Sequence, residues 1–220
     1  MADAKKGDSF MRQNRIKKFL TAGLSGLLIL SLTGCGQAAK LPETVVNTSL
    51  VVEKDGKVTS YLVNTFDKDF YSLDGLEEMV KNEAEEFNAA HTDTPEEALT
   101  VKTVQALDDG AMVQVVQEFD SADSYAEYND QDLFYGTRVE ALAQGSPVNK
   151  ELVNAADGTP ADPDKLEKAL EKGHLIITNA SAYIYCPYPV LYISEGVVMG
   201  EDGSVDASQS DGVVTILMKK

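Results

Sequence analysis

The feature that most constrains the fold of this chain is an N-terminal segment that we expect to be removed from it. Four basic residues precede an apolar run from Phe19 to Thr33, namely Arg12, Arg15, Lys17 and Lys18. A membrane-spanning helix needs about 18 or more apolar residues, whereas this run has 15 and includes Thr21 and Ser25. A buried helix would show a polar face, which is missing here. A basic stretch, a short apolar run and small residues are typical of a secretory signal peptide.

The end of this segment, Leu32-Thr33-Gly34-Cys35, resembles the box cut by the bacterial lipoprotein signal peptidase. That box reads Leu, a small residue, Gly or Ala, and then Cys. The resemblance implies acylation of Cys35 and cleavage between Gly34 and Cys35, so that residues 1–34 form the signal peptide. It also implies a lipid-anchored protein at the outer face of the cytoplasmic membrane. Because Met11 starts a complete basic region, residues 1–10 would be an upstream extension.

The charge of the remaining chain restricts its partners. Residues 1–34 hold 6 of the 19 Lys and Arg and 2 of the 36 Asp and Glu, so 13 basic and 34 acidic residues remain, a net charge of −21. Such a field repels nucleic acid and anionic lipid headgroups, which excludes a nucleic-acid role. The simplest use of this acidity is solubility, and binding of cations or basic partners is the alternative.

The number of cysteines indicates that the stability of the fold must come from a hydrophobic core and not from disulfides. With Cys35 acylated, Cys186 is the only cysteine left, so no intramolecular disulfide can form. We expect residues 35–44 to be the lipidated Cys and a short tether, and residues 45–220 to form a single α+β domain. A chain of this length can bury roughly 70% of its unfolded surface.

Two β-hairpins are predicted by alternating apolar and polar residues on either side of a turn. The first joins Ser49–Val52 to Val58–Phe66 around Gly56, and the second spans Leu99–Phe119 around Asp108-Asp109-Gly110. A helix is expected after each hairpin, and the second of these covers Ser121–Tyr128. The repeated order of hairpin and helix leaves an internal duplication open.

The predicted helices carry capping residues. In the first, Asp74 is expected to cap with Glu77, and one face holds Leu76, Met79, Val80 and Phe87. Thr137 and Glu140 form a capping box for a short helix that stops at Gly145. Asp162 and Pro163 open a further helix that ends at Gly173.

The last part of the chain reads as strands rich in β-branched and aromatic residues. The predicted strands are His174–Thr178, Ala182–Cys186, Val190–Val198 and Val213–Met218. Hairpin-paired strands with helices between them favour an α+β fold, with a mainly antiparallel sheet and several helices packed on it.

Three blocks carry a second resemblance, and they are Phe134–Thr137, Leu175–Asn179 and Val190–Val197. They are similar to blocks in uncharacterised lipoproteins of gut Clostridia. The resemblance implies a Gram-positive source and no known activity.

No residue pattern predicts catalysis or a metal site, so we expect no catalytic residue, no metal and no cofactor. His91, His174 and Cys186 have no zinc-ligand spacing. Cys186 and His174 could form a thiolate–imidazole pair, but the alternation of the strand places Cys186 beside Ile184, as a buried and inert thiol. The acidic clusters follow no calcium-loop pattern and are explained by turns and helix caps; they are Asp67, Asp69 and Asp74, and Asp130 and Asp132.

The candidate binding surface is a group of tyrosines: Tyr183, Tyr185, Tyr188 and Tyr192. Tyr183 and Tyr185 share one strand face, where open rings could stack on sugars or grip a peptide. The alternative is a half-buried face covered by helices.

These features together predict a membrane-anchored, non-catalytic binding or scaffolding domain. Its expected partners are the lipid bilayer, through acylated Cys35, and an envelope glycan or a protein. Two alternatives stay open. One is a hydrolase of envelope polymers that uses carboxylates, and the other is an accessory subunit of a transport or secretion complex.

Overall fold

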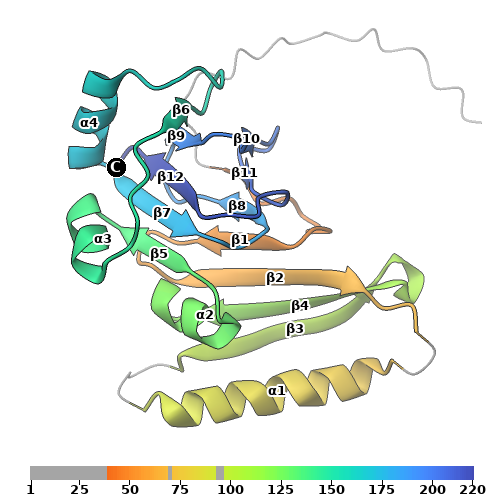
Figure 1. Ribbon diagram of the computed structural model, residues 1–220. Helices are drawn as coiled ribbons and strands as arrows, with labels where there is room; N and C mark the ends of the chain where they lie inside the picture. Colours follow the sequence, from red (N-terminus) through yellow and green to blue (C-terminus); the bar gives the residue numbers. More distant parts are fainter. Residues whose placement is uncertain (1–38, 69–70, 93–96) are drawn as a thin grey trace, which may run out of the picture. The chain divides into compact units, whose positions relative to one another are not determined.

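The computed structural model of the protein describes residues 39–68, 71–92 and 97–220 (Figure 1). Helices and two mostly antiparallel sheets make up this part of the chain, so the α+β prediction is confirmed. The predicted signal peptide, Cys35 and Asp69 lie outside the described residues. Among the helices that are described, none combines the length and the apolar character that crossing a membrane would require.

The larger sheet has seven strands in the order β10-β11-β8-β1-β2-β4-β3. The strands are β1 (Ser49–Val52), β2 (Val58–Thr65), β3 (Leu99–Leu107), β4 (Met112–Phe119), β8 (Tyr183–Tyr185), β10 (Val198–Met199) and β11 (Val205–Asp206). Every pairing is antiparallel except that of β1 with β8, which is parallel. This one parallel pair joins the first described strand to a strand near the end of the sequence.

Both predicted hairpins are present. β1 pairs with β2 across a turn in which Gly56 has φ 93°, and β3 pairs with β4 across a turn in which Gly110 also has φ 93°. Asp108 and Asp109 adopt positive φ values of 49° and 52° in the second turn. Positive φ strains most residues other than Gly, Asn and Asp, so the turn residues explain where each hairpin reverses.

The second sheet has five strands in the order β5-β7-β12-β9-β6, all antiparallel. They are β5 (Leu133–Gly136), β6 (Leu152–Asn154), β7 (His174–Thr178), β9 (Val190–Ser194) and β12 (Val214–Met218). The predicted strands at 174–178, 182–186 and 213–218 are confirmed with small changes of boundary. The predicted strand at 190–198 is instead two strands in different sheets, because the chain turns at Gly196, where φ is 86°.

The main core lies between the two sheets. It contains Leu50, Val58, Phe119 and Ile184 from the larger sheet and Ile176, Ile193, Val214 and Ile216 from the smaller one. A second core lies on the other face of the smaller sheet, where strand residues such as Leu175, Ile177 and Leu217 pack against helix residues such as Ala141, Leu166 and Leu170. The described domain therefore has three layers in this region, with helices α3 (Arg138–Gln144) and α4 (Pro163–Lys172) outermost.

Helix α1 (Leu73–Ala90) lies along β3, as Figure 1 shows. Its cap is Ser72, whose side chain accepts a hydrogen bond from the Gly75 backbone, so the predicted cap at Asp74 is wrong by two residues. Asp74 lies in the first turn instead, where a negative charge suits the helix dipole. Val80 is buried, but Met79 is 49% exposed, so the predicted apolar face is only partly covered.

The other helices begin as predicted. The side chain of Ser121 caps α2 (Ala122–Asn129), Thr137 and Glu140 form the capping box of α3, and Asp162 caps α4 before Pro163. Gly145 ends α3 in the left-handed conformation, with φ 78°. Ser, Thr and Asp side chains satisfy backbone N–H groups at these helix starts, which is why the sequence locates them well.

Part of the expected tether is attached to the domain. The backbone N–H of Lys40 donates to the Asp202 carbonyl at 3.2 Å, and Val45 is buried. The Val45 carbonyl accepts a 2.7 Å hydrogen bond from the Gln114 side chain. The chain is therefore held against the larger sheet from Ala39 onward, rather than from Val45.

Candidate functional site

The candidate site is a pocket on the face of the larger sheet that points away from the main core. Strand register places Tyr185 beside Val51, Val51 beside Thr59, and Thr59 beside Glu118, so these four side chains form one row across β8, β1, β2 and β4. Their immediate neighbours in sequence, such as Ile184, point to the other side and enter the core. Alternation along each strand therefore builds both the core and the pocket floor.

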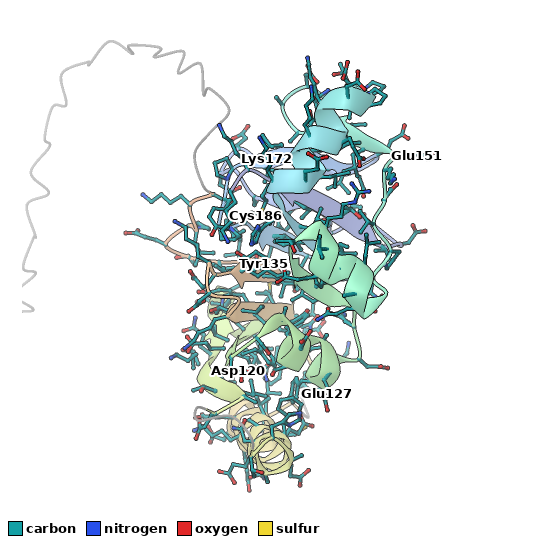
Figure 2. The ribbon with its side chains drawn as sticks, turned by 90° about the vertical axis from the view of Figure 1, so that its left-hand side faces the viewer. Asp120, Glu127, Tyr135, Glu151, Lys172 and Cys186 are labelled. Atoms are coloured by element: carbon teal, nitrogen blue, oxygen red, sulfur yellow. The ribbon has the colours of Figure 1, made fainter. Side chains whose placement is uncertain are left out.

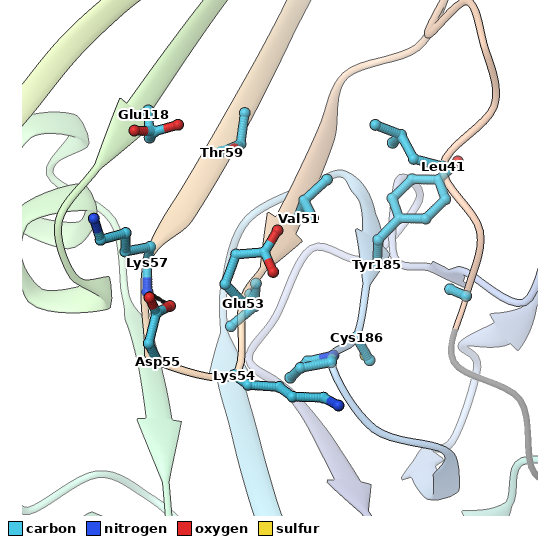
Figure 3. A pocket seen from close by; sticks show the side chains of 13 residues that line it. Leu41, Val51, Glu53, Lys54, Asp55, Lys57, Thr59, Glu118, Tyr185 and Cys186 are labelled. Carbon is cyan, nitrogen blue, oxygen red and sulfur yellow. Dashed lines mark hydrogen bonds between the residues drawn. The ribbon is translucent and has the colours of Figure 1, made fainter.

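The pocket has a volume of about 730 Å³. It is lined by Ala39, Leu41, Val51, Val52, Glu53, Lys54, Asp55, Lys57, Thr59, Glu118, Tyr185, Cys186 and Pro187. Figure 3 shows Leu41 and Tyr185 along one side and Asp55, Lys57 and Glu118 along the other. One wall is therefore apolar, and the opposite wall carries charges of both signs.

The β1–β2 turn supplies most of these charges and is held by its own backbone. The Glu53 N–H donates to the Lys57 carbonyl at 2.8 Å, and the Gly56 N–H donates to the Glu53 carbonyl at 3.1 Å. The Lys57 N–H also donates to Asp55 Oδ1 at 3.2 Å. Outside the turn, the Tyr135 hydroxyl donates to the Lys54 carbonyl at 3.3 Å. A turn fixed at several points presents its side chains in a defined arrangement.

Tyr185 is a buried wall of the pocket and not an open ring, so the predicted exposure of the Tyr183–Tyr185 face is wrong for this residue. Its side chain is 5% exposed, and its hydroxyl donates to Asp202 Oδ2 at 2.6 Å. Burial works to raise the pKa of Asp202, but hydrogen bonds from Ser204 and Tyr185 lower it overall. Burial, followed by the Asp202 carboxylate, raises the pKa of Tyr185. Both groups therefore act as a fixed hydrogen-bonded pair.

The other predicted tyrosines lie in different surroundings. Tyr183 is half-buried on the same face as Tyr185. Tyr188 is half-buried with the Lys54 ammonium 5.6 Å from its ring centroid, and Tyr192 is buried in the core beneath the helices. Of the four, only Tyr185 lines the pocket. The alternative of a covered face describes Tyr185 and Tyr192 better, because both are less than a tenth exposed.

Cys186 borders the pocket but is buried in the same core as Ile184, as the alternation predicted. Burial raises the pKa of its thiol to about 12. The thiolate is the nucleophilic form of cysteine, so this thiol is inert near neutral pH. The geometry therefore gives no support to a thiolate–imidazole pair with His174.

His174 lies between two aromatic rings at the start of β7. Its ring centroid is 5.6 Å from that of Tyr135 and 5.8 Å from that of Tyr188. Burial, and then the Lys220 ammonium, lowers its pKa, and its Nε2 lies 3.1 Å from Lys220 Nζ. A neutral ring that accepts from Lys220 fits this arrangement. Within the described residues, no group of three or more His, Cys, Asp or Glu side chains is placed to hold a metal ion.

The carboxyl groups with shifted pKa values favour the charged form. The pKa is lowered for Glu140, Asp157, Glu167 and Asp202, in each case with hydrogen bonds among the causes. A carboxylic acid that works as a general acid near neutral pH needs a raised pKa. These four residues are therefore structural acceptors, and none of them supports the hydrolase alternative.

The pocket residues Val51, Thr59 and Glu118 were not singled out from the sequence. Alternation shows which residues share a face of one strand, but it does not show that β8 lies beside β1. That pairing joins Ser49–Val51 to Tyr183–Tyr185 and leaves no local sequence pattern. The sequence indicated the site only through the hairpin turn around Gly56 and through Tyr185.

Comparisons of the chain with family models, with curated proteins and with solved structures find no match. Function is therefore inferred from the sequence and from the residues of the pocket.

Proposed function

We propose that this chain is a surface lipoprotein, anchored to the outer face of the cytoplasmic membrane through acylated Cys35. We further propose that its folded domain binds a peptide segment in the pocket beside the β1–β2 turn and performs no catalysis. The anchor rests on the sequence pattern that ends at Cys35, and the binding role rests on the geometry of the pocket.

The observation that carries the proposal is the position of the pocket in the chain. Ala39 and Leu41 line it, and Lys40 is bound through its backbone to Asp202. Ala39 follows Cys35 by only four residues, which span at most about 14 Å when fully extended. A pocket tied so closely to an acylated cysteine stays near the bilayer surface. Its ligand is then a component of the envelope or a protein at the membrane.

The lining of the pocket favours a peptide as the ligand. The lining combines the basic residues Lys54 and Lys57, the acidic residues Glu53 and Glu118, and the fixed apolar wall of Tyr185. Peptides carry backbone polar groups together with apolar and charged side chains, which suits such a mixed surface.

Two features support binding over catalysis. The one thiol at the pocket, Cys186, is buried with a raised pKa and is a poor nucleophile. The hydroxyl of Tyr185 is engaged with Asp202. Both groups shape the pocket wall and are held away from a bound ligand.

The anchor is tested by lipid labelling of the natural chain and of Cys35→Ala in a Gram-positive host. We expect the natural chain to incorporate labelled fatty acid and Cys35→Ala to accumulate as an uncleaved, unlabelled precursor. Two acyl chains, at about 0.8 kcal/mol per buried CH₂, give stable attachment. Equal labelling of both proteins would show that Cys35 is not the lipidated residue.

The pocket is tested by affinity selection from a random peptide library. Thr59→Trp places a large ring inside the pocket, whereas Thr103→Trp places the same ring on the same face of the sheet, at an exposed position of the edge strand β3 outside the pocket. We expect the natural chain and Thr103→Trp to select peptides that carry charges of both signs next to apolar residues, and Thr59→Trp to select none. Selection of the same peptides by Thr59→Trp would rule out this pocket as the binding site.

A further inference from the structure

A second hollow, separate from the pocket above, lies between the first half of α1 and strands β2 and β4. Its volume is about 480 Å³. The lining residues are Leu62, Asn64, Thr65, Phe66, Tyr71, Ser72, Gly75, Leu76, Met79, Val113 and Val115. None of these lining side chains carries a charge, although a quarter of the whole chain is charged. We call this hollow the apolar groove.

The groove exists because α1 covers only part of the sheet. Register places Leu62 beside Val115 and Asn64 beside Val113, on the same face of β2 as the core residue Val58. α1 runs along β3, the neighbouring edge strand (Figure 1). A strip of β2 at Leu62 and Asn64 is therefore left open beside the helix, with the buried side chains of Val113 and Val115 on β4 beneath it.

Exposure confirms that large apolar side chains face this open strip. Leu62 is 43% exposed, Tyr71 is 44% exposed and Met79 is 49% exposed. Met79 follows Gly75 by four residues and Leu76 by three, and these two follow the capping Ser72 by three and four, so all four line one side of the helix. Val80 and Ala84, by contrast, are buried. The apolar face of the helix is thus buried at Val80 and Ala84 and open toward the groove at Met79.

The charge of α1 indicates what can cover the groove. The helix carries six acidic residues and a single basic residue, Lys81, whose ammonium is paired with Glu77 at 2.5 Å. A partner that lies beside α1 therefore meets an apolar floor next to an acidic helix. An acyl chain would contact the apolar floor but would have no favourable interaction with the acidic side chains of α1. A second copy of this acidic chain would be repelled by those side chains.

We propose that the apolar groove docks an amphipathic helix of a partner protein, with apolar side chains on β2 and β4 and basic side chains toward α1. Helices pack side by side at 8–10 Å, so a helix next to α1 would extend the layer that α1 begins. Binding of an amphipathic helix in an apolar groove is a recurring mode of peptide recognition. The proposal does not depend on the peptide pocket, which lies on the opposite face of the sheet.

The first test uses a synthetic helix of about 18 residues, with leucines on one face and lysines on the other, and the full chain labelled with carbon-13 at its methionine methyl groups. We expect the Met79 signal to shift on addition of the peptide, because Met79 lines the groove. Met218, which is fully buried, should not shift. Binding of the peptide without a shift of the Met79 signal would overturn the proposal.

The second test compares two exposed leucines. Leu62→Asp places a charge in the groove, and Leu142→Asp makes the same change on α3, where Leu142 is 59% exposed. We expect Leu62→Asp to weaken peptide binding by about tenfold or more and Leu142→Asp to leave it unchanged. A peptide with glutamates in place of lysines should bind more weakly by a similar factor. Equal effects of the two variants, or equal binding of the two peptides, would contradict the proposal.

Two further measurements decide between this occupant and the others. If sedimentation shows a dimer of the natural chain that Leu62→Asp dissociates, the groove holds a second copy. If an uncharged lysolipid displaces the peptide and shifts the Met79 signal alone, the groove holds an acyl chain. Either result would replace the helical partner proposed here. Thermal unfolding of both variants checks that each one is folded before binding is compared.

Discussion

His91 Nε2, at the end of α1, lies 3.1 Å from Glu127 Oε2 in α2. The other ring nitrogen, Nδ1, lies 2.8 Å from the Phe87 carbonyl, and the imidazole stacks on the Phe87 ring with centroids 4.1 Å apart. Glu127 lies on α2 above the end of α1 in Figure 2. Both ring nitrogens thus face oxygen acceptors, an arrangement that favours the protonated imidazolium and joins two helices.

This contact predicts a pH-dependent contribution to stability. The hydrogen bond to the Phe87 backbone and then the one to Glu127 raise the pKa of His91. A group with a raised pKa stabilises the fold below its unfolded value of about 6.5 and loses that effect as the pH rises through its folded value. The melting-temperature difference between the natural chain and His91→Gln should therefore be largest below about pH 6.5 and shrink as the pH rises above it. A difference that does not change with pH would contradict this assignment.

Cys186 should resist alkylation in the folded protein. The thiol is 4% exposed, and burial raises its pKa to about 12, so little thiolate forms at neutral pH. In a chain with Cys35→Ala, where Cys186 is the only thiol, iodoacetamide should label the protein only in denaturant. Cys186→Ala should cost about 1–2 kcal/mol of unfolding free energy. Rapid labelling of the native protein would restore the case for a reactive thiol.

Tyr185→Phe should destabilise the fold although it removes a single oxygen. The Tyr185 hydroxyl donates to the Asp202 carboxylate at 2.6 Å, and the variant leaves one acceptor without this donor. A hydrogen bond to a charged group contributes about 1.5–3 kcal/mol, and chemical denaturation should show a loss of that order. Tyr183→Phe is the control, because Tyr183 is half-buried on the same strand face. Equal stability of the natural chain and Tyr185→Phe would show that the bond contributes nothing.

Gly173→Ala should be far more harmful than Gly212→Ala. A Cβ atom at Gly173 would lie 2.5 Å from the Met218 carbonyl oxygen and 2.8 Å from the Ala169 carbonyl oxygen, whereas one at Gly212 would meet nothing within 4 Å. Because backbone atoms cannot move aside cheaply, we expect Gly173→Ala to cost about 2–3 kcal/mol. Thermal unfolding of both variants measures the difference. Similar melting temperatures would show that α4 shifts freely against β12.

Local chemistry predicted most of the elements. Gly56 and Gly110 located the two hairpin turns, because each needs positive φ. The capping box of Thr137 and the Asp162–Pro163 pair located α3 and α4, because the starts of helices depend on a few adjacent residues. The error at Asp74 arose because Ser72 offers an equally good cap two residues earlier.

Such local patterns could not predict which strands that are far apart in the sequence pair with each other. The four-residue strand β5 and the two-residue strand β11 have no alternation long enough to detect, and both form because neighbouring strands offer free edges. The burial of Tyr185 depends on Asp202 and on the segment at Leu41, which reach it through the fold. The candidate site was therefore predicted only at its turn and at Tyr185, and the burial of Tyr185 was missed because a single strand does not show what covers it.

The position of β12 has a consequence for how the chain folds. β12 lies at the centre of the smaller sheet, between β7 and β9, although it comes last among the strands in the sequence. β7 and β9 cannot pair with β12 until Val214–Met218 has left the ribosome. In the same way, β1 cannot pair with β8 until Tyr183–Tyr185 has been made. Contacts between distant segments slow folding. A chain exported in the extended form, as our anchoring proposal requires, would thus be kept from folding prematurely by the order of its own strands.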